Sequence, residues 1–144
     1  MSITSINCHK FPYNKRIIPF IAIYVMTSYL LTIHSGPWSN QSVSTACQFA
    51  KTALLAGNEI KAIFLYQDGV LNGLKDIDIP SDELNGQNLL LALSKAHNLD
   101  ILLCVTAAEK RGIQQHSIAD GFTIAGLAEY AELSASTDKV IQFK

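Results

Sequence analysis

Three observations predict an α/β protein, with a mainly parallel sheet and helices on both of its faces. Strand-like and helix-like stretches alternate from Thr27 to the C-terminus, with glycine and proline between them. The run Ile101–Val105 is apolar without alternation, as expected of a strand buried on both faces. Strands that alternate with helices form right-handed crossovers and hence parallel pairs. With 144 residues, 49% of them hydrophobic, the chain is long enough for one domain with its own core.

The expected strands are short runs rich in β-branched, aromatic and aliphatic residues. They cover Tyr29–Ile33, Ile60–Tyr66, Ile101–Val105 and 139–143. The first ends at the turn cluster His34-Ser35-Gly36-Pro37, and the second ends at Gln67-Asp68-Gly69.

The expected helices carry apolar residues at helical spacing. One begins at a capping residue, Ser42 or Ser44, and ends before Gly57, where a left-handed residue is favoured. The others cover 89–96 and Ile124–Leu133. Between the second strand and the second helix, residues 72–86 hold two glycines, a proline and four acidic residues, which predicts a long loop.

The first 27 residues are predicted to be an N-terminal extension outside the fold, which leaves residues 28–144 as the domain. Three cations precede an uncharged run from Ile17 to Ile33, and this order is similar to that of a signal peptide, so export or anchoring is the alternative. However, no small-x-small cleavage site follows, and the run falls short of the roughly 20 residues that span a bilayer. Its second half is also the first expected strand, which Met26 closely precedes. We therefore expect a cytoplasmic protein.

Composition and motifs argue against several classes of function. The formal net charge is −1 and no basic stripe is visible, so direct nucleic-acid binding is not expected. The three cysteines are widely spaced, which suits neither a disulfide framework nor a zinc site and fits a reducing compartment. No glycine-rich phosphate motif follows the first strand, and the four histidines lack metal-ligand spacing. Neither a cofactor nor a metal is therefore expected.

Cys104 is the candidate catalytic residue. It follows the apolar run 101–103, and the helix-like stretch after it holds Lys110 and Arg111. Nearby cations and a helix N-terminus favour the thiolate, which is the nucleophile and sulfur acceptor. The alternative is that Cys104 is a small hydrophobic residue at the end of a core strand. Cys47, inside a helical pattern, is interpreted as a core residue.

The expected parallel sheet helps to decide whether Cys104 is catalytic or only a core residue. All strands of a parallel sheet end at one edge, so His34–Trp38, Tyr66–Val70 and Cys104–Ala108 are expected to converge there. Ligands of open α/β sheets bind at that edge, which favours a functional reading of Cys104.

Several segments resemble, in the same order, the DsrE/TusD family of sulfur-relay proteins. They are Phe64–Asn72, Pro80–Glu83, Cys104–Ala108 with Arg111-Gly112, Gly121–Thr123 with Gly126-Leu127, and Asp138–Phe143. The resemblance covers nearly all of Ser28 to Phe143 and is strongest to the TusD branch.

This resemblance implies a DsrE-like fold and a sulfurtransferase subunit that carries persulfide sulfur on Cys104. It also implies a heteromer with TusB-like and TusC-like subunits, an upstream TusA-like sulfur donor, a downstream TusE-like acceptor, and a role in thiolation of the tRNA wobble uridine. Mean hydropathy of +0.20 despite polar loops agrees with a partner-covered surface. A DsrE-type carrier of dissimilatory sulfur oxidation and a non-catalytic structural subunit remain the alternatives. The chain departs from the family in its extension 1–27 and in a shorter stretch between Gly112 and Gly121.

Overall fold

The computed structural model describes residues 25–38 and 41–144, which form one five-stranded sheet with the strand order β4-β3-β2-β1-β5. Every neighbouring pair of strands in it is parallel. The strands are β1 (Ser28–Ile33), β2 (Glu59–Leu65), β3 (Ile101–Cys104), β4 (Thr123–Ala125) and β5 (Lys139–Phe143). The helices are α1 (Ser42–Leu55), α2 (Gly86–His97), α3 (Val105–Glu109) and α4 (Leu127–Ala135), with short 3₁₀ turns η1 (Gln67–Gly73) and η2 (Gln115–Ser117).

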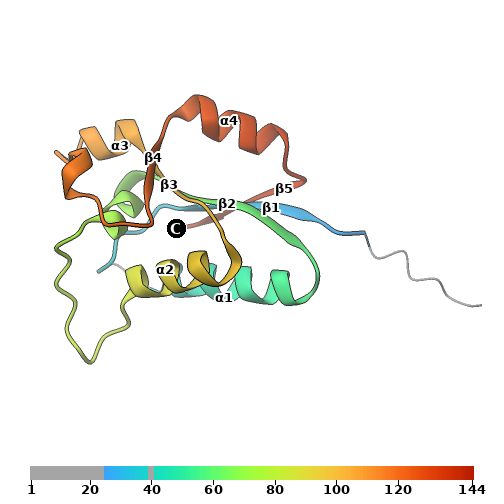
Figure 1. Ribbon diagram of the computed structural model, residues 1–144, viewed down its shortest axis with the longest axis horizontal. Coiled ribbons are helices and arrows are strands. Elements are labelled where there is room, and N and C mark those ends of the chain that lie inside the picture. The colour runs from blue at the N-terminus through green and yellow to red at the C-terminus, as the bar shows by residue number, and fades with distance from the viewer. Residues whose placement is uncertain (1–24, 39–40) are drawn as a thin grey trace, which may run out of the picture.

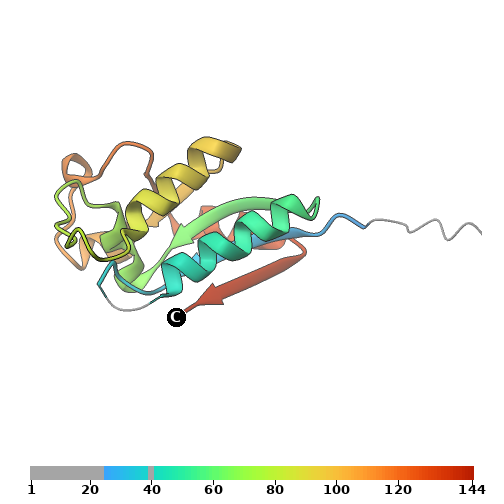
Figure 2. The ribbon, with the colours of Figure 1, turned by 90° about the horizontal axis from the view of Figure 1, so that it is seen from below.

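The helices lie in two layers, one on each face of the sheet. Helices α1 and α2 cover one face, and α3 and α4 lie over the other (Figures 1 and 2). Phe64 of β2 packs against Tyr130 of α4, with ring centroids 4.7 Å apart. On the opposite face, Tyr29 of β1 meets Phe49 of α1 at 5.4 Å. The predicted α/β class, with helices on both faces of a parallel sheet, is confirmed.

The central strands form the core. All four residues of β3 are buried, as are the last four of β1 and of β2. This agrees with the continuous apolar run in β3, because a strand covered on both faces has no solvent side for polar residues. The core fixes the strand ends in place, and the loops at the carboxyl edge are built on them.

The sequence-based interpretation was wrong for the segment Ile124–Leu133, which was expected to be a single helix. Residues Thr123–Ala125 instead form β4 beside β3, and α4 begins only after Gly126. A strand of three residues is too short to show a period of two, and its apolar residues continue the stripe of the helix that follows. Two smaller differences concern helix starts. A serine was expected to cap α1, but the N-cap residue is Gln41, whose side chain forms no capping hydrogen bond. Helix α2 begins at Gly86, and the side chain of Asn85 caps it.

Ser28, at the amino end of β1, forms hydrogen bonds with Asp138, the residue that precedes β5. The Ser28 hydroxyl donates to Asp138 Oδ2 at 2.6 Å, and the backbone N–H of Ser28 donates to the same oxygen at 2.8 Å. These bonds lower the pKa of Asp138, with the hydroxyl bond as the larger cause. The contact closes the sheet at the end away from the predicted site.

Only residues 25–27 of the predicted extension lie within the described part of the chain. Val25 and Met26 are exposed, whereas Thr27 donates its N–H to Asn58 Oδ1 at 3.1 Å. The boundary near residue 27 stays a prediction. Within the described residues, no helix is both long and apolar enough to cross a membrane.

Candidate functional site

The ends of β1, β2 and β3 meet at one edge of the sheet, as the topology predicted. His34 follows β1 and Tyr66 follows β2, and their rings meet edge to face with centroids 5.5 Å apart. Cys104 is the last residue of β3. The turn η1, which follows β2, packs against α3, which follows β3. Residues far apart in the sequence therefore share one short stretch of surface.

Close packing holds η1 against the ends of β1 and β3. A Cβ atom added to Gly69 would come within 2.2 Å of the backbone oxygen of Ile33, and one added to Gly73 within 2.4 Å of Leu103 Cδ2. Only glycine therefore lets the backbone of η1 approach both strands this closely. These contacts fix the position of Asp68, the neighbour of Gly69.

Cys104 lies at the junction of β3 and α3, and its side chain is fully buried at 0% exposure. Leu102 pairs with Phe64, the residue that packs under α4. Because side chains alternate along a strand, Cys104 lies on the same face of β3 as Leu102. The thiol is thus at the functional edge, beneath the layer of α3 and α4.

Arg111 is bound rather than solvated. Its Nη2 and Nε lie 2.6 and 2.9 Å from Asp68 Oδ1, and its Nη1 donates to the Ala107 carbonyl at 3.0 Å. The ion pair ties the end of α3 to η1. Lys110 and Arg111 were both predicted to lie near the sulfur, and the structure pairs the charge of Arg111 with a carboxylate. Among the described residues Lys110 forms no ion pair, so it is the remaining cation of this segment.

Asp68 lies in the turn cluster after the second expected strand, and the sequence did not predict that it contacts the segment after Cys104. Its partner is 43 positions away, and no local pattern joins the two. The contact between Asp68 and Arg111 could have been anticipated from the topology, because the carboxyl ends of β2 and β3 lie side by side. The segment that follows β2 is therefore beside the segment that follows β3.

A cavity of about 210 Å³ opens between these segments. Its lining includes Tyr66 from the end of β2, Thr106 and Lys110 from the segment after Cys104, and Leu127 from α4. Leu65 and Leu103 are the last paired residues of β2 and β3, and Tyr66 and Cys104 directly follow them in the chain. The cavity is therefore next to the thiol, although Cys104 itself is not part of its lining.

The other described cysteine has a different environment. Cys47 lies in the middle of α1 and is 2% exposed, and burial raises the pKa of its thiol to about 11, against a smaller lowering by Lys51. A thiol with that pKa stays protonated at neutral pH and is a poor nucleophile. The interpretation of Cys47 as a core residue agrees with this.

Within the described residues, no cluster of histidine, cysteine and carboxylate groups could hold a metal ion.

The fold and this edge define an open parallel α/β protein with a cysteine where a strand passes into a helix. Residues 27–143 match the model of the DsrE/DsrF-like family, and the chain belongs to that family.

The individual relatives are named as sulfurtransferases. The chain is 36% identical to a protein named sulfurtransferase TusD homolog from Vibrio vulnificus, over 80% of this chain and 96% of that protein. It is 33% identical to the putative sulfurtransferase DsrE of Allochromatium vinosum, over 80% of this chain and 97% of that protein.

Solved structures agree on the fold. The YchN protein of E. coli has a TM-score of 0.71 at 28% identity, over 82% of this chain and 100% of that one. A protein of Methanobacterium thermoautotrophicum, MTH1491, has a TM-score of 0.63 at 11% identity, which supports the fold alone.

Proposed function

We propose that this chain is a sulfurtransferase subunit of a sulfur relay, which accepts sulfur as a persulfide on Cys104. The observation that carries the proposal is the position of Cys104 at the carboxyl edge, between β3 and α3. The names of the relatives support sulfur transfer as the general activity. The further destination of the sulfur in this proposal is the 2-thiolation of the tRNA wobble uridine.

The transfer is a thiol–persulfide exchange. The thiolate of Cys104 attacks the terminal sulfur of a donor persulfide, and the sulfur–sulfur bond of the donor breaks. The donor cysteine leaves as a thiolate, and the terminal sulfur stays on Cys104 as a new persulfide. Oxidation of one cysteine balances reduction of the other, so no external oxidant or reductant is needed. The reverse exchange hands the sulfur to the next carrier.

The burial of Cys104 imposes a condition on this chemistry. A thiol at 0% exposure cannot meet a donor until the layer above it moves. Helix α3 has only five residues and is tied to η1 through Arg111 and Asp68. It is the short element next to the cysteine, and its displacement would open a path from the adjacent cavity to the sulfur. Donor binding at that cavity would favour the open state.

Partners are part of the proposal. TusB-like and TusC-like subunits would form the heteromer, a TusA-like protein would donate sulfur, and a TusE-like protein would accept it. Exposed apolar side chains support an interface on the α4 side of the sheet, since Leu127 is 50% exposed and Val140 is 37% exposed.

Coexpression with the two subunits should raise solubility and give one complex on size exclusion. A stable monomer that ignores both at micromolar concentration would contradict this assembly while leaving the chemistry of Cys104 open.

The second candidate is a carrier in dissimilatory sulfur oxidation. The identity of 33% to the DsrE protein is close to the 36% to the TusD homolog, which favours neither pathway strongly. A cell that lacks this chain should lose 2-thiouridine from its tRNA under the first candidate. Unchanged 2-thiouridine together with impaired sulfur oxidation would support the second. The third candidate, a structural subunit without transfer, predicts that no sulfur is loaded at all.

Intact-mass analysis tests the central claim. The protein is incubated with a cysteine desulfurase, its carrier and cysteine, and we expect a gain of one sulfur atom. Cys104→Ser should abolish the gain, and Cys47→Ser should retain it. Loading that survives Cys104→Ser would refute the proposal. Because a buried hydroxyl costs about 1 kcal/mol or more, circular dichroism of both variants is needed to show that they fold.

A further inference from the structure

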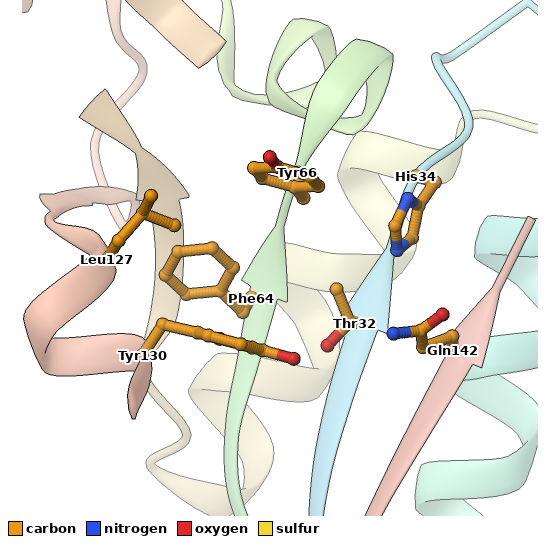
Figure 3. A pocket seen from close by; sticks show the side chains of 7 residues that line it. All are labelled: Thr32, His34, Phe64, Tyr66, Leu127, Tyr130 and Gln142. Atoms are coloured by element: carbon orange, nitrogen blue, oxygen red, sulfur yellow. The ribbon is translucent and has the colours of Figure 1, made fainter. Parts of the chain in front are cut away.

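A second cavity lies at the carboxyl ends of β1, β2 and β5, under α4, and Cys104 is not part of its lining. Its volume is about 240 Å³. Phe64 and Tyr130 form an aromatic wall (Figure 3). Tyr66 and Leu127 line both this cavity and the one beside α3. A mostly apolar concavity with a few convergent polar groups is typical of a small-molecule site.

Two of its polar atoms are buried without a partner. Thr32 is 2% exposed, and its Oγ1 forms no hydrogen bond with the described residues. His34 follows β1, two residues after Thr32, and its Nε2 atom is also buried without a hydrogen bond to the described residues. Most buried polar atoms in proteins are hydrogen-bonded, because leaving one unpaired costs free energy. Two such atoms in one cavity indicate a site built for a ligand.

The hydrogen-bonding character of these atoms restricts the ligand. His34 Nδ1 lies 3.0 Å from Gln67 Oε1, and in the tautomer that satisfies this contact Nδ1 carries the hydrogen. Nε2 is then an acceptor and requires a donor from the ligand. The hydroxyl of Thr32 can supply the complementary donor. In Figure 3 the Gln142 amide and the Tyr130 hydroxyl also point toward Thr32.

Charge and size restrict the ligand further. Within the described residues, no Asp, Glu, Lys or Arg lines this cavity, so an anion or a cation would lose its hydration without a compensating charge. The volume equals that of about eight water molecules, which is enough for a single ring. Flat rings also suit the aromatic wall, since aromatic faces stack favourably.

We propose that this cavity binds a neutral, planar, ring-sized ligand that presents an N–H donor beside a carbonyl acceptor, the class of cyclic amides. The N–H donates to His34 Nε2, and the carbonyl accepts from the Thr32 hydroxyl. Phe64, Tyr66 and Tyr130 enclose the ring. Cys104 does not line this cavity, so the proposal does not depend on the sulfur chemistry.

The test uses 2-pyridone as the probe, followed by nuclear magnetic resonance of the full chain. We expect saturable shifts with a Kd of about 1 mM or below, which is reasonable for so small a ligand. N-Methyl-2-pyridone, which lacks only the N–H, should bind at least tenfold more weakly, and so should benzoate, which is charged. Equal binding of the methylated probe, or no saturable binding of 2-pyridone, would overturn the proposal.

Variants of the protein provide the matched controls. Thr32→Val keeps the shape of the side chain and removes the hydroxyl, and His34→Asn keeps a donor toward Gln67 and removes Nε2. Each should raise the Kd of 2-pyridone at least tenfold. Thr52→Val, on α1 with its hydroxyl bonded to Gln48, should leave the Kd unchanged. The unfolding midpoint of ligand-free Thr32→Val should equal or exceed that of the wild type, because an unpaired buried hydroxyl is lost. A lower midpoint would show that Thr32 has a structural partner and would contradict the proposed role.

Discussion

The two ends of strand β1 bury a hydroxyl group in opposite ways. At the amino end, Ser28 is 8% exposed, and its hydroxyl donates to Asp138 Oδ2 and accepts from the Asp138 N–H. At the carboxyl end, Thr32 is 2% exposed and its hydroxyl has no partner among the described residues. The unpaired hydroxyl costs about 1–3 kcal/mol. The paired hydroxyl at the amino end stabilises the fold, whereas the unpaired hydroxyl at the carboxyl end is available to the proposed ligand.

A loosely packed carboxyl end would explain the unpaired atoms without any ligand, and Gly69→Ala tests this. The added methyl group would overlap the Ile33 carbonyl oxygen at 2.2 Å. If the packing is as tight as the structure shows, the free energy of unfolding should fall by about 2 kcal/mol or more, as in overpacked cores. Gly126→Ala is the control, since its nearest contact would be 3.9 Å away, and it should cost less than about 1 kcal/mol. Urea unfolding measures both, and equal midpoints would show a deformable carboxyl end.

The amino end should show its role through pH. The pKa of Asp138 is lowered from 3.8 by the Ser28 bonds, so the folded state binds this proton less tightly than the unfolded chain. The contribution of Asp138 is therefore fully present above pH 3.8 and is lost as the pH falls through the lowered value. Asp138→Asn should lower the urea midpoint near neutral pH, and the gap to the wild type should close in acid. A constant gap from about pH 6 to about pH 3 would assign the effect to packing instead.

The buried strands could be predicted from the sequence, whereas the side-chain contacts at the carboxyl end could not. The buried strands were predictable, because β-branched and apolar runs such as Ile101–Cys104 reflect burial on both faces. The position of Cys104 at the edge follows from the strand alternation alone. Neither the partner of Asp68 nor the unpaired state of Thr32 was predictable, because both depend on side chains brought together by the sheet. The strand β4 was missed because three residues carry no readable period.

Asp68→Asn should loosen α3 at the carboxyl end of the sheet, because it removes the ion pair with Arg111. The side chain of Asp68 is 65% exposed and that of Arg111 is 27% exposed, so the pair contributes only about 0–1 kcal/mol. That range corresponds to at most about a fivefold change in an equilibrium. We expect alkylation of Cys104 in the native protein to rise by up to that factor. Cys47 is the internal control, because burial raises its pKa to about 11 and it lies in α1, outside the Asp68–Arg111 ion pair. Equal gains at both cysteines would indicate general destabilisation rather than a local opening.

The smallest effect is expected from removing residues 1–25, so that the chain begins at Met26. Strand β1 begins at Ser28, and Thr27 still bonds to Asn58 and accepts the N–H of Glu59 at 3.0 Å. Val25 is 74% exposed and Met26 is 58% exposed, so little apolar burial is lost at the cut.

We therefore expect the same urea midpoint, the same sulfur loading on Cys104 and the same affinity for 2-pyridone as in the full chain. A lower midpoint would place part of the extension in the fold. Recovery of the full chain, but not the shortened one, in a membrane fraction would instead give the segment an anchoring role, as its cations and apolar run allow.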